Sequence, residues 1–169
     1  SHGIFGLGTM KLRGLLEAGA SIGLGYDGAV AGFRNDMFEQ MKLAVMIQRL
    51  QSMDPTKSGP REALELATRG GAEFLGLEAG ILRPGLLADM AVVSLQGAHM
   101  TPRPAPIPAV AYTARSNDVE MTLVGGEIIF ENGRGTKIDE DLAMEEAHAR
   151  SSELLDRLNL SSEIDPRIQ

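Results

Sequence analysis

The residues of this chain that could do chemistry are few, and one aspartate has a distinctive position. Asp27 lies in the run GLGYDG, just after the short apolar stretch 20–25. Such a stretch between two helix-like segments predicts a strand buried on both faces of a parallel sheet. Ligand-binding and catalytic side chains gather at the carboxyl ends of these strands. Asp27 is therefore either a carboxylate of a functional site or, as the alternative, a residue that caps a turn through an Asx hydrogen bond.

The remaining candidates for metal or nucleotide chemistry form no clear pattern. His2, His99 and His148 are far apart, and no two of them have the spacing of a metal-binding pair. We expect His99 and His148 to be solvated surface residues. The absence of cysteine excludes thiolate metal sites and the P-C-x-x-C signature of zinc nucleobase deaminases. Gly23 and Gly25 match only part of a dinucleotide-binding motif, so a nucleotide-binding domain is the weaker alternative.

The composition limits the class of protein. With 169 residues, 43% of them hydrophobic, the chain is long enough for one domain with a sizeable core. Its 23 acidic and 16 basic residues give a net charge of −7, which argues against a nucleic-acid-binding surface. No apolar run approaches the roughly 20 residues that span a bilayer, and no secretory signal is visible. We expect a cytoplasmic protein that binds neither nucleic acid nor membrane.

The first half of the chain has mainly helical patterns around the apolar stretch. Thr9 is the predicted N-cap of a short helix that ends at Gly19. After the strand at 20–25, residues 26–35 are a predicted loop, and Asp36 is the predicted cap of a largely apolar helix.

A further helix is predicted to begin at Pro60, because proline suits the first helical position. Gly70 and Gly71 lie inside this helix, where each costs about 1 kcal/mol relative to alanine. We therefore expect another part of the chain to pack closely against these glycines.

The second half of the chain is richer in strand patterns. Three β-rich runs follow one another, at 88–95, 109–114 and 120–130. Gly125 and Gly126 between two apolar runs predict a hairpin turn. The proline-rich segment 99–108 is predicted to be extended. The acidic segment 139–160 predicts an amphipathic helix that faces solvent.

Together these segments resemble the amidohydrolase superfamily, in the branch of cytosine deaminase, S-adenosylhomocysteine-type deaminases and triazine hydrolases. The run LLEAGASIGLGYDG is similar to the family's last-strand motif, in which an aspartate ends the eighth barrel strand. The run ALELATRGGAEFLGLEAGILRPGLLADMAVV resembles the stretch that leads from the barrel into a small β-sandwich. DVEMTLVGGEIIFENGR is similar to the closing strands of that sandwich.

The resemblance implies an α/β fold: the C-terminal part of a (β/α)8 TIM-like barrel, strands of a small β-sandwich and a C-terminal helix. The implied division places the last barrel strand and its helices in residues 1–79. The sandwich segment follows in residues 80–136, and the C-terminal helix and tail occupy residues 137–169.

For the site, the resemblance implies that Asp27 binds the catalytic divalent metal, zinc or alternatively iron, and serves as the general base. A metal lowers the pKa of its water from 15.7 to about 7, and a nearby carboxylate can then carry the proton. The loop 29–35 would border the substrate pocket, although no substrate-binding residue is assigned. Tyr26 replaces the small hydroxyl residue that is usual in the family. Asp89 matches a position with a structural role.

The histidine ligands of the family are missing from this chain, and a complete barrel takes about 250 residues. The implied function is therefore that of a C-terminal fragment. Its parent would be a metal-dependent hydrolase of carbon–nitrogen bonds other than peptide bonds, which deaminates a small heterocyclic substrate. We expect the chain alone to be inactive and to self-associate or form a homo-oligomer through exposed apolar surface. The alternative is a non-catalytic module with a structural or assembly role. An H-x-H motif encoded upstream would favour the enzyme.

Overall fold

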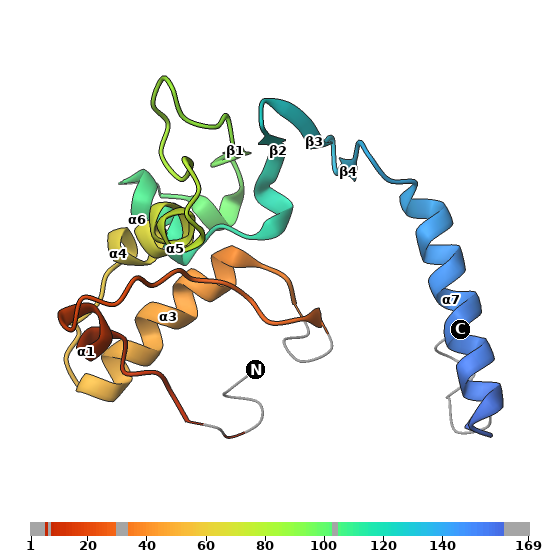
Figure 1. Cartoon of the computed structure of the whole chain (residues 1–169), viewed down its shortest axis with the longest axis horizontal. Helices are drawn as coiled ribbons and strands as arrows, with labels where there is room; N and C mark the ends of the chain where they lie inside the picture. The colour runs from red at the N-terminus through yellow and green to blue at the C-terminus, as the bar shows by residue number, and fades with distance from the viewer. Residues whose placement is uncertain (1–5, 7, 30–33, 103–104, 161–169) are drawn as a thin grey trace.

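The computed structural model describes residues 6, 8–29, 34–102 and 105–160, and within them the chain is a mixed α/β structure. Most of the helices come first, a four-stranded antiparallel sheet follows with one more helix between its first two strands, and a long terminal helix ends the described chain (Figure 1). The predicted α/β class is therefore confirmed. The bounds of the helices that form the helical body are α1 (Leu12–Glu17), α3 (Met37–Ser52), α4 (Pro60–Glu65), α5 (Gly71–Leu75) and α6 (Pro106–Tyr112).

Helix α3 begins where the sequence predicts, because Asp36 caps it. One carboxylate oxygen of Asp36 accepts hydrogen bonds from the amides of Phe38 and Glu39, at 2.9 and 3.3 Å. The prediction for α1 is only half right: Gly19 follows its end with a φ of 78°, but Lys11 rather than Thr9 is the N-cap.

Helices α4 and α5 are joined by a π-helical turn, Leu66–Gly70, so that residues 60–75 run as one interrupted helix. Pro60 occupies the start of α4, as predicted. A π turn widens a helix locally and is rare in regular helices.

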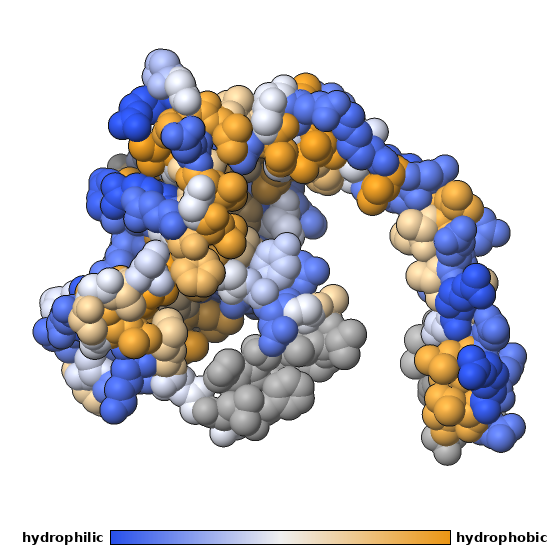
Figure 2. Space-filling view, in the orientation of Figure 1, coloured by the Kyte–Doolittle hydropathy of each residue, from blue (hydrophilic) through white to orange (hydrophobic). Residues whose placement is uncertain are grey.

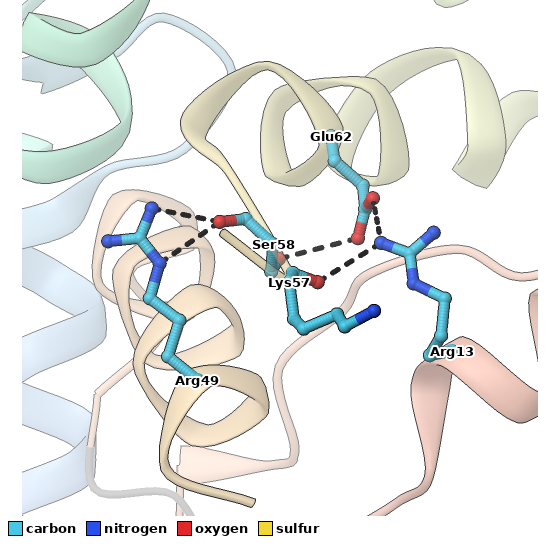
Figure 3. Close-up of polar contacts among 5 residues, drawn as sticks. All are labelled: Arg13, Arg49, Lys57, Ser58 and Glu62. Atoms are coloured by element: carbon cyan, nitrogen blue, oxygen red, sulfur yellow. Dashed lines mark hydrogen bonds and ion pairs between the residues drawn. The ribbon is translucent and has the colours of Figure 1, made fainter. Parts of the chain in front are cut away.

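Two arginines connect α1 and α3 to the turn that precedes α4 (Figure 3). Arg13 donates through Nη2 to the carboxylate of Glu62 at 2.6 Å and to the carbonyl oxygen of Lys57 at 3.1 Å. Arg49 donates from Nε and Nη2 to the carbonyl oxygen of Ser58, at 3.0 and 2.8 Å. These bonds hold the turn that precedes α4 against α1 and α3.

The strand predicted at 20–25 does not form within the described residues. Residues 20–28 have no regular secondary structure. The amide of Leu24 donates to the carbonyl oxygen of Leu66 in the π turn, at 2.8 Å, instead of to a neighbouring strand. A strand needs partners on its edges, and the described sheet strands all come from a later part of the chain.

The sheet consists of β1 (Met90–Val93), β2 (Val119–Val124), β3 (Glu127–Glu131) and β4 (Arg134–Gly135), in the order β1-β2-β3-β4. Gly125 and Gly126 form the predicted hairpin turn, with φ values of 58° and 83°. The amide of Gly125 donates to the carboxylate of Asp89 at 2.6 Å. Asp89 therefore fastens the hairpin to the entry of β1, which agrees with its expected structural role.

The prediction of a strand at 109–114 is wrong. These residues lie largely in α6, which packs against α3 and α4 and buries Ala109 and Ala111. The segment 99–108 is also not extended throughout, because its described residues include the end of a 3-10 turn, Ala98–Met100, and the start of α6. Pro106 and Pro108 do not prevent the helix, because amides in the first turn have no acceptor within the helix. A six-residue apolar run cannot by its periodicity distinguish a buried helix from a strand.

The core is small and lies between these helices. Met41, Val45, Ala63 and Ala111 form one buried cluster, next to a second of Met100, Ala109 and Ala114. The terminal helix α7 (Glu140–Arg157) buries no residue and stands apart from the helical body (Figure 1), as predicted for a solvent-facing helix. Figure 2 shows apolar side chains on the surface of both the body and α7.

Candidate functional site

Asp27 lies on the surface at the end of the extended segment 20–28. Its Oδ1 accepts a hydrogen bond from the amide of the next residue, Gly28, at 2.7 Å. This bond orients the carboxylate within its own turn. It is compatible with a turn-forming aspartate and equally with a ligand, since a carboxylate has further lone pairs on both oxygens.

The position of this segment is set by contact with the interrupted helix. A Cβ atom on Gly23 would lie 2.8 Å from the Cα of Gly71, a distance that real side chains do not adopt. The predicted close approach at Gly70 and Gly71 is therefore confirmed, and its partner is the segment that ends in Asp27. The hydrogen bond between Leu24 and Leu66 lies at the same crossing.

The described residues do not complete a metal site around Asp27. Across the ranges 8–29, 34–102 and 105–160, no three histidine, cysteine, aspartate or glutamate side chains are grouped so that they could hold a metal ion. His148 is exposed on α7, as predicted, and His2 lies outside the described residues. An open cavity of about 410 Å³ lies between α1, α3 and Lys57, but Asp27 does not line it.

His99 has a more specific environment than the sequence predicts. Its Nε2 lies 2.9 Å from Oδ2 of Asp118, which also accepts the amide of Arg115 at 2.8 Å. Burial works to raise the pKa of Asp118. The hydrogen bonds from His99 and Arg115, with their positive charges, outweigh burial and lower that pKa below its ordinary value. No pattern in the sequence predicts the contact between His99 and Asp118, which are 19 positions apart.

A second carboxylate lies at the same junction between helices and sheet. Oδ2 of Asp36 accepts the amide of Ser116 at 3.1 Å, while Oδ1 caps α3. Asp36 therefore holds the chain just after the candidate loop to the segment that leads into β2. The cap is predictable from the sequence, whereas the hydrogen bond to Ser116 is not.

Comparisons with known proteins identify the family of this chain. Residues 1–129 match the profile of the Amidohydrolase family. The chain belongs to the amidohydrolase family. It is 36% identical over 152 residues to the 5'-deoxyadenosine deaminase of Methanosarcina mazei, and the matched region covers 90% of this chain and 35% of the relative. It is 42% identical over 123 residues to the 5-methylthioadenosine/S-adenosylhomocysteine deaminase of Thermococcus kodakarensis, covering 73% of this chain and 29% of that protein.

Two solved structures share the fold of this chain. Atrazine chlorohydrolase from Arthrobacter aurescens, complexed with zinc, superposes with a TM-score of 0.78 at 29% identity, over 85% of this chain and 32% of that one. A zinc-bound adenosine deaminase from Xanthomonas campestris has the same TM-score at 23% identity, over 82% of this chain and 32% of its own. The amidohydrolase chain described here thus spans about a third of the length of its relatives. None of the helices in its described part has the length and hydropathy that a bilayer crossing requires.

Proposed function

We propose that this chain is the C-terminal portion of a metal-dependent deaminase and that Asp27 is one of its catalytic residues. The chain would contribute the extended segment that ends in Asp27, the helices around it, part of a small β-sandwich and the terminal helix. The observation that carries the proposal is the 36% identity to a 5'-deoxyadenosine deaminase over 90% of the chain. The crossing at Gly23 supports it, because this contact holds the segment that ends in Asp27 against the helical body.

The substrate class follows from the relatives. Their names specify deoxyadenosine, methylthioadenosine and S-adenosylhomocysteine, all of which carry an adenine ring. We therefore narrow the expected heterocycle to an adenine nucleoside, from which hydrolysis would remove the exocyclic amine.

The described residues of this chain can supply one ligand of a zinc site. Asp27 is exposed and carboxylate oxygen is an accepted zinc ligand, but one carboxylate cannot hold the ion alone. Zinc is the metal we propose, with iron as the alternative; when bound, it would activate water as a nucleophile at neutral pH. Asp27 would hold it, take a proton from the attacking water and return that proton to the leaving amine. The other ligands would come from outside the described residues.

The proposal predicts that Asp27→Asn inactivates the whole enzyme that contains this chain. Loss of a general base costs about 10²- to 10⁴-fold in kcat. The assay monitors deamination of 5'-deoxyadenosine through the ammonia released, and the metal content of each variant is measured in parallel. Asp54→Asn is the matched control, since Asp54 is likewise a turn aspartate whose Oδ1 accepts a nearby main-chain amide, that of Thr56, and it lies in the turn before α4. An Asp27→Asn enzyme with unchanged kcat would contradict the proposal.

A second prediction concerns the 169-residue chain by itself. With one proposed ligand it should neither bind zinc tightly nor deaminate adenine nucleosides, because a catalytic zinc needs three protein ligands. Isothermal titration with zinc and the ammonia assay test this. Metal-dependent turnover by the purified chain would refute it and would require a complete site within these residues.

A further inference from the structure

The π turn Leu66–Gly70 is contacted by main-chain atoms from two sides. A Cβ on Gly70 would lie 2.7 Å from the carbonyl oxygen of Ile22. On another side, a Cβ on Gly80 would lie 2.7 Å from the Cα of Arg69. Main-chain atoms cannot swing aside as the end of a flexible side chain can. The π turn is therefore enclosed between the segment that ends in Asp27 and the loop that leads toward the sheet.

One hydrogen bond also fixes the position of the segment along the helix. The amide of Leu24 donates to the carbonyl oxygen of Leu66 at 2.8 Å, so the segment is fixed along its length as well as in its distance from the helix. Asp27 follows Leu24 by three residues, which is about 10 Å of extended chain. Residues 20–28 belong to no described strand, so this crossing, together with the packing of the Leu24 side chain against the buried cluster around Met41 and Val45, holds the segment in place.

We infer that the main-chain crossing of Gly23 and Leu24 over the π turn is a positioning device for Asp27. Gly23 and Gly70 are positioning residues, because their lack of a side chain lets the two backbones meet. The role of Asp27 itself rests on the proposed function. The position of Asp27, however, is measurable without any activity.

The chain contains matched controls for this inference. A Cβ on Gly25 would meet nothing within 4 Å, and one on Gly71 would meet only the Leu66 carbonyl oxygen, at 3.8 Å. Gly25→Ala is therefore the control for Gly23→Ala in the extended segment. Gly71→Ala is the control for Gly70→Ala in the helix.

The first experiment measures the 169-residue chain by NMR. Hydrogen exchange at the Leu24 amide reports the crossing, and the chemical shift of the Gly28 amide reports its hydrogen bond to the Asp27 carboxylate. We expect Gly23→Ala and Gly70→Ala to accelerate exchange at Leu24 by about tenfold or more and to displace the Gly28 amide resonance. The two control variants should leave both readouts unchanged.

If Gly23→Ala does not fold, Gly70→Ala carries the test at both amides. Leu24→Pro, which removes the donor and its amide, is then read at the Gly28 amide alone. Wild-type exchange at Leu24 in Gly70→Ala, with a wild-type Gly28 amide resonance in the folded variants, would overturn the inference.

The second experiment measures kcat, KM and metal content of the whole enzyme. We expect Gly23→Ala to lower kcat by about 100-fold, because a misplacement of about 1 Å can cost that much. If Asp27→Asn is inactive and Gly23→Ala has wild-type kcat, the positioning inference fails and the proposed function stands. If Asp27→Asn is active, the proposed function fails, while the NMR measurements still decide the geometry.

Discussion

At the scale of single residues, two carboxylates join distant segments just before β2. Asp36 caps α3 with one oxygen and accepts the amide of Ser116 with the other. Asp118 accepts both the imidazole of His99 and the amide of Arg115. Each carboxylate therefore satisfies donors from two segments that are distant in sequence. Hydrogen bonds of this charge-assisted kind are stronger than neutral ones.

The Asp118 junction predicts a specific dependence on pH. The folded-state pKa of Asp118 is lowered from its ordinary 3.8, so its contribution to stability is present above that value and is lost as pH falls through the folded pKa. Asp118→Asn should reduce the free energy of unfolding by about 1 kcal/mol at pH 7. The difference from wild type should shrink below pH 3.8. Urea denaturation at several pH values measures this.

The control for this prediction is Glu146→Gln, which removes an exposed carboxylate on α7. It should leave the stability unchanged at neutral pH. A constant difference between Asp118→Asn and wild type across the acid range would contradict the assignment of the lowered pKa to this junction.

At the scale of elements, most of those with strong local determinants matched their sequence prediction, the N-cap of α1 being the exception. Asp36 begins α3, Pro60 begins α4 and two glycines form the β2–β3 turn, because a cap or a turn depends on residues adjacent in sequence. Helix α6 was missed because its short apolar run has no local feature that excludes a strand. Its helical form is stabilised by burial of small side chains against α3 and α4.

The hairpin allows a test of its turn chemistry. Both Gly125 and Gly126 have positive φ, which suits the type I′ turn that favours Asn-Gly. Gly125→Asn should keep the free energy of unfolding within about 0.5 kcal/mol of wild type, since asparagine tolerates this backbone region. Gly126→Val should destabilise by at least about 1 kcal/mol, because a β-branched residue does not. Thermal and urea unfolding compare the two. Equal effects would show that backbone strain is not the determinant.

At the scale of the whole molecule, many large apolar side chains lie on the surface, outside the small core. Leu43, Met46, Leu50 and Met53 form an exposed stripe on and just after α3, and Met53 is 86% exposed. Leu154 and Leu158 are likewise exposed at the end of α7. Large apolar patches are uncommon on soluble monomers and mark surfaces that other chains or segments cover. Self-association of this chain remains a prediction.

We expect the isolated chain to self-associate with increasing concentration, and the α3 stripe to contribute. Replacing both Leu50 and Met53 by glutamine should weaken association, because burial of each apolar side chain contributes about 1.5–3 kcal/mol. Sedimentation velocity over a concentration series measures this, with Lys42→Gln as a polar control on the same helix. A monomer at every concentration would contradict the expectation.

The sequence by itself determined the local features and the family. Caps, turn glycines and the two glycines inside the interrupted helix follow from the conformational needs of single residues, and the ordered motifs identified the amidohydrolase relationship. The tertiary structure decided what depends on distant partners. Residues 20–25 bond to a π turn rather than to strands, and Asp36 and Asp118 join segments far apart in the chain. A hydrogen bond between distant segments exists only once both are in place, so no local pattern encodes it.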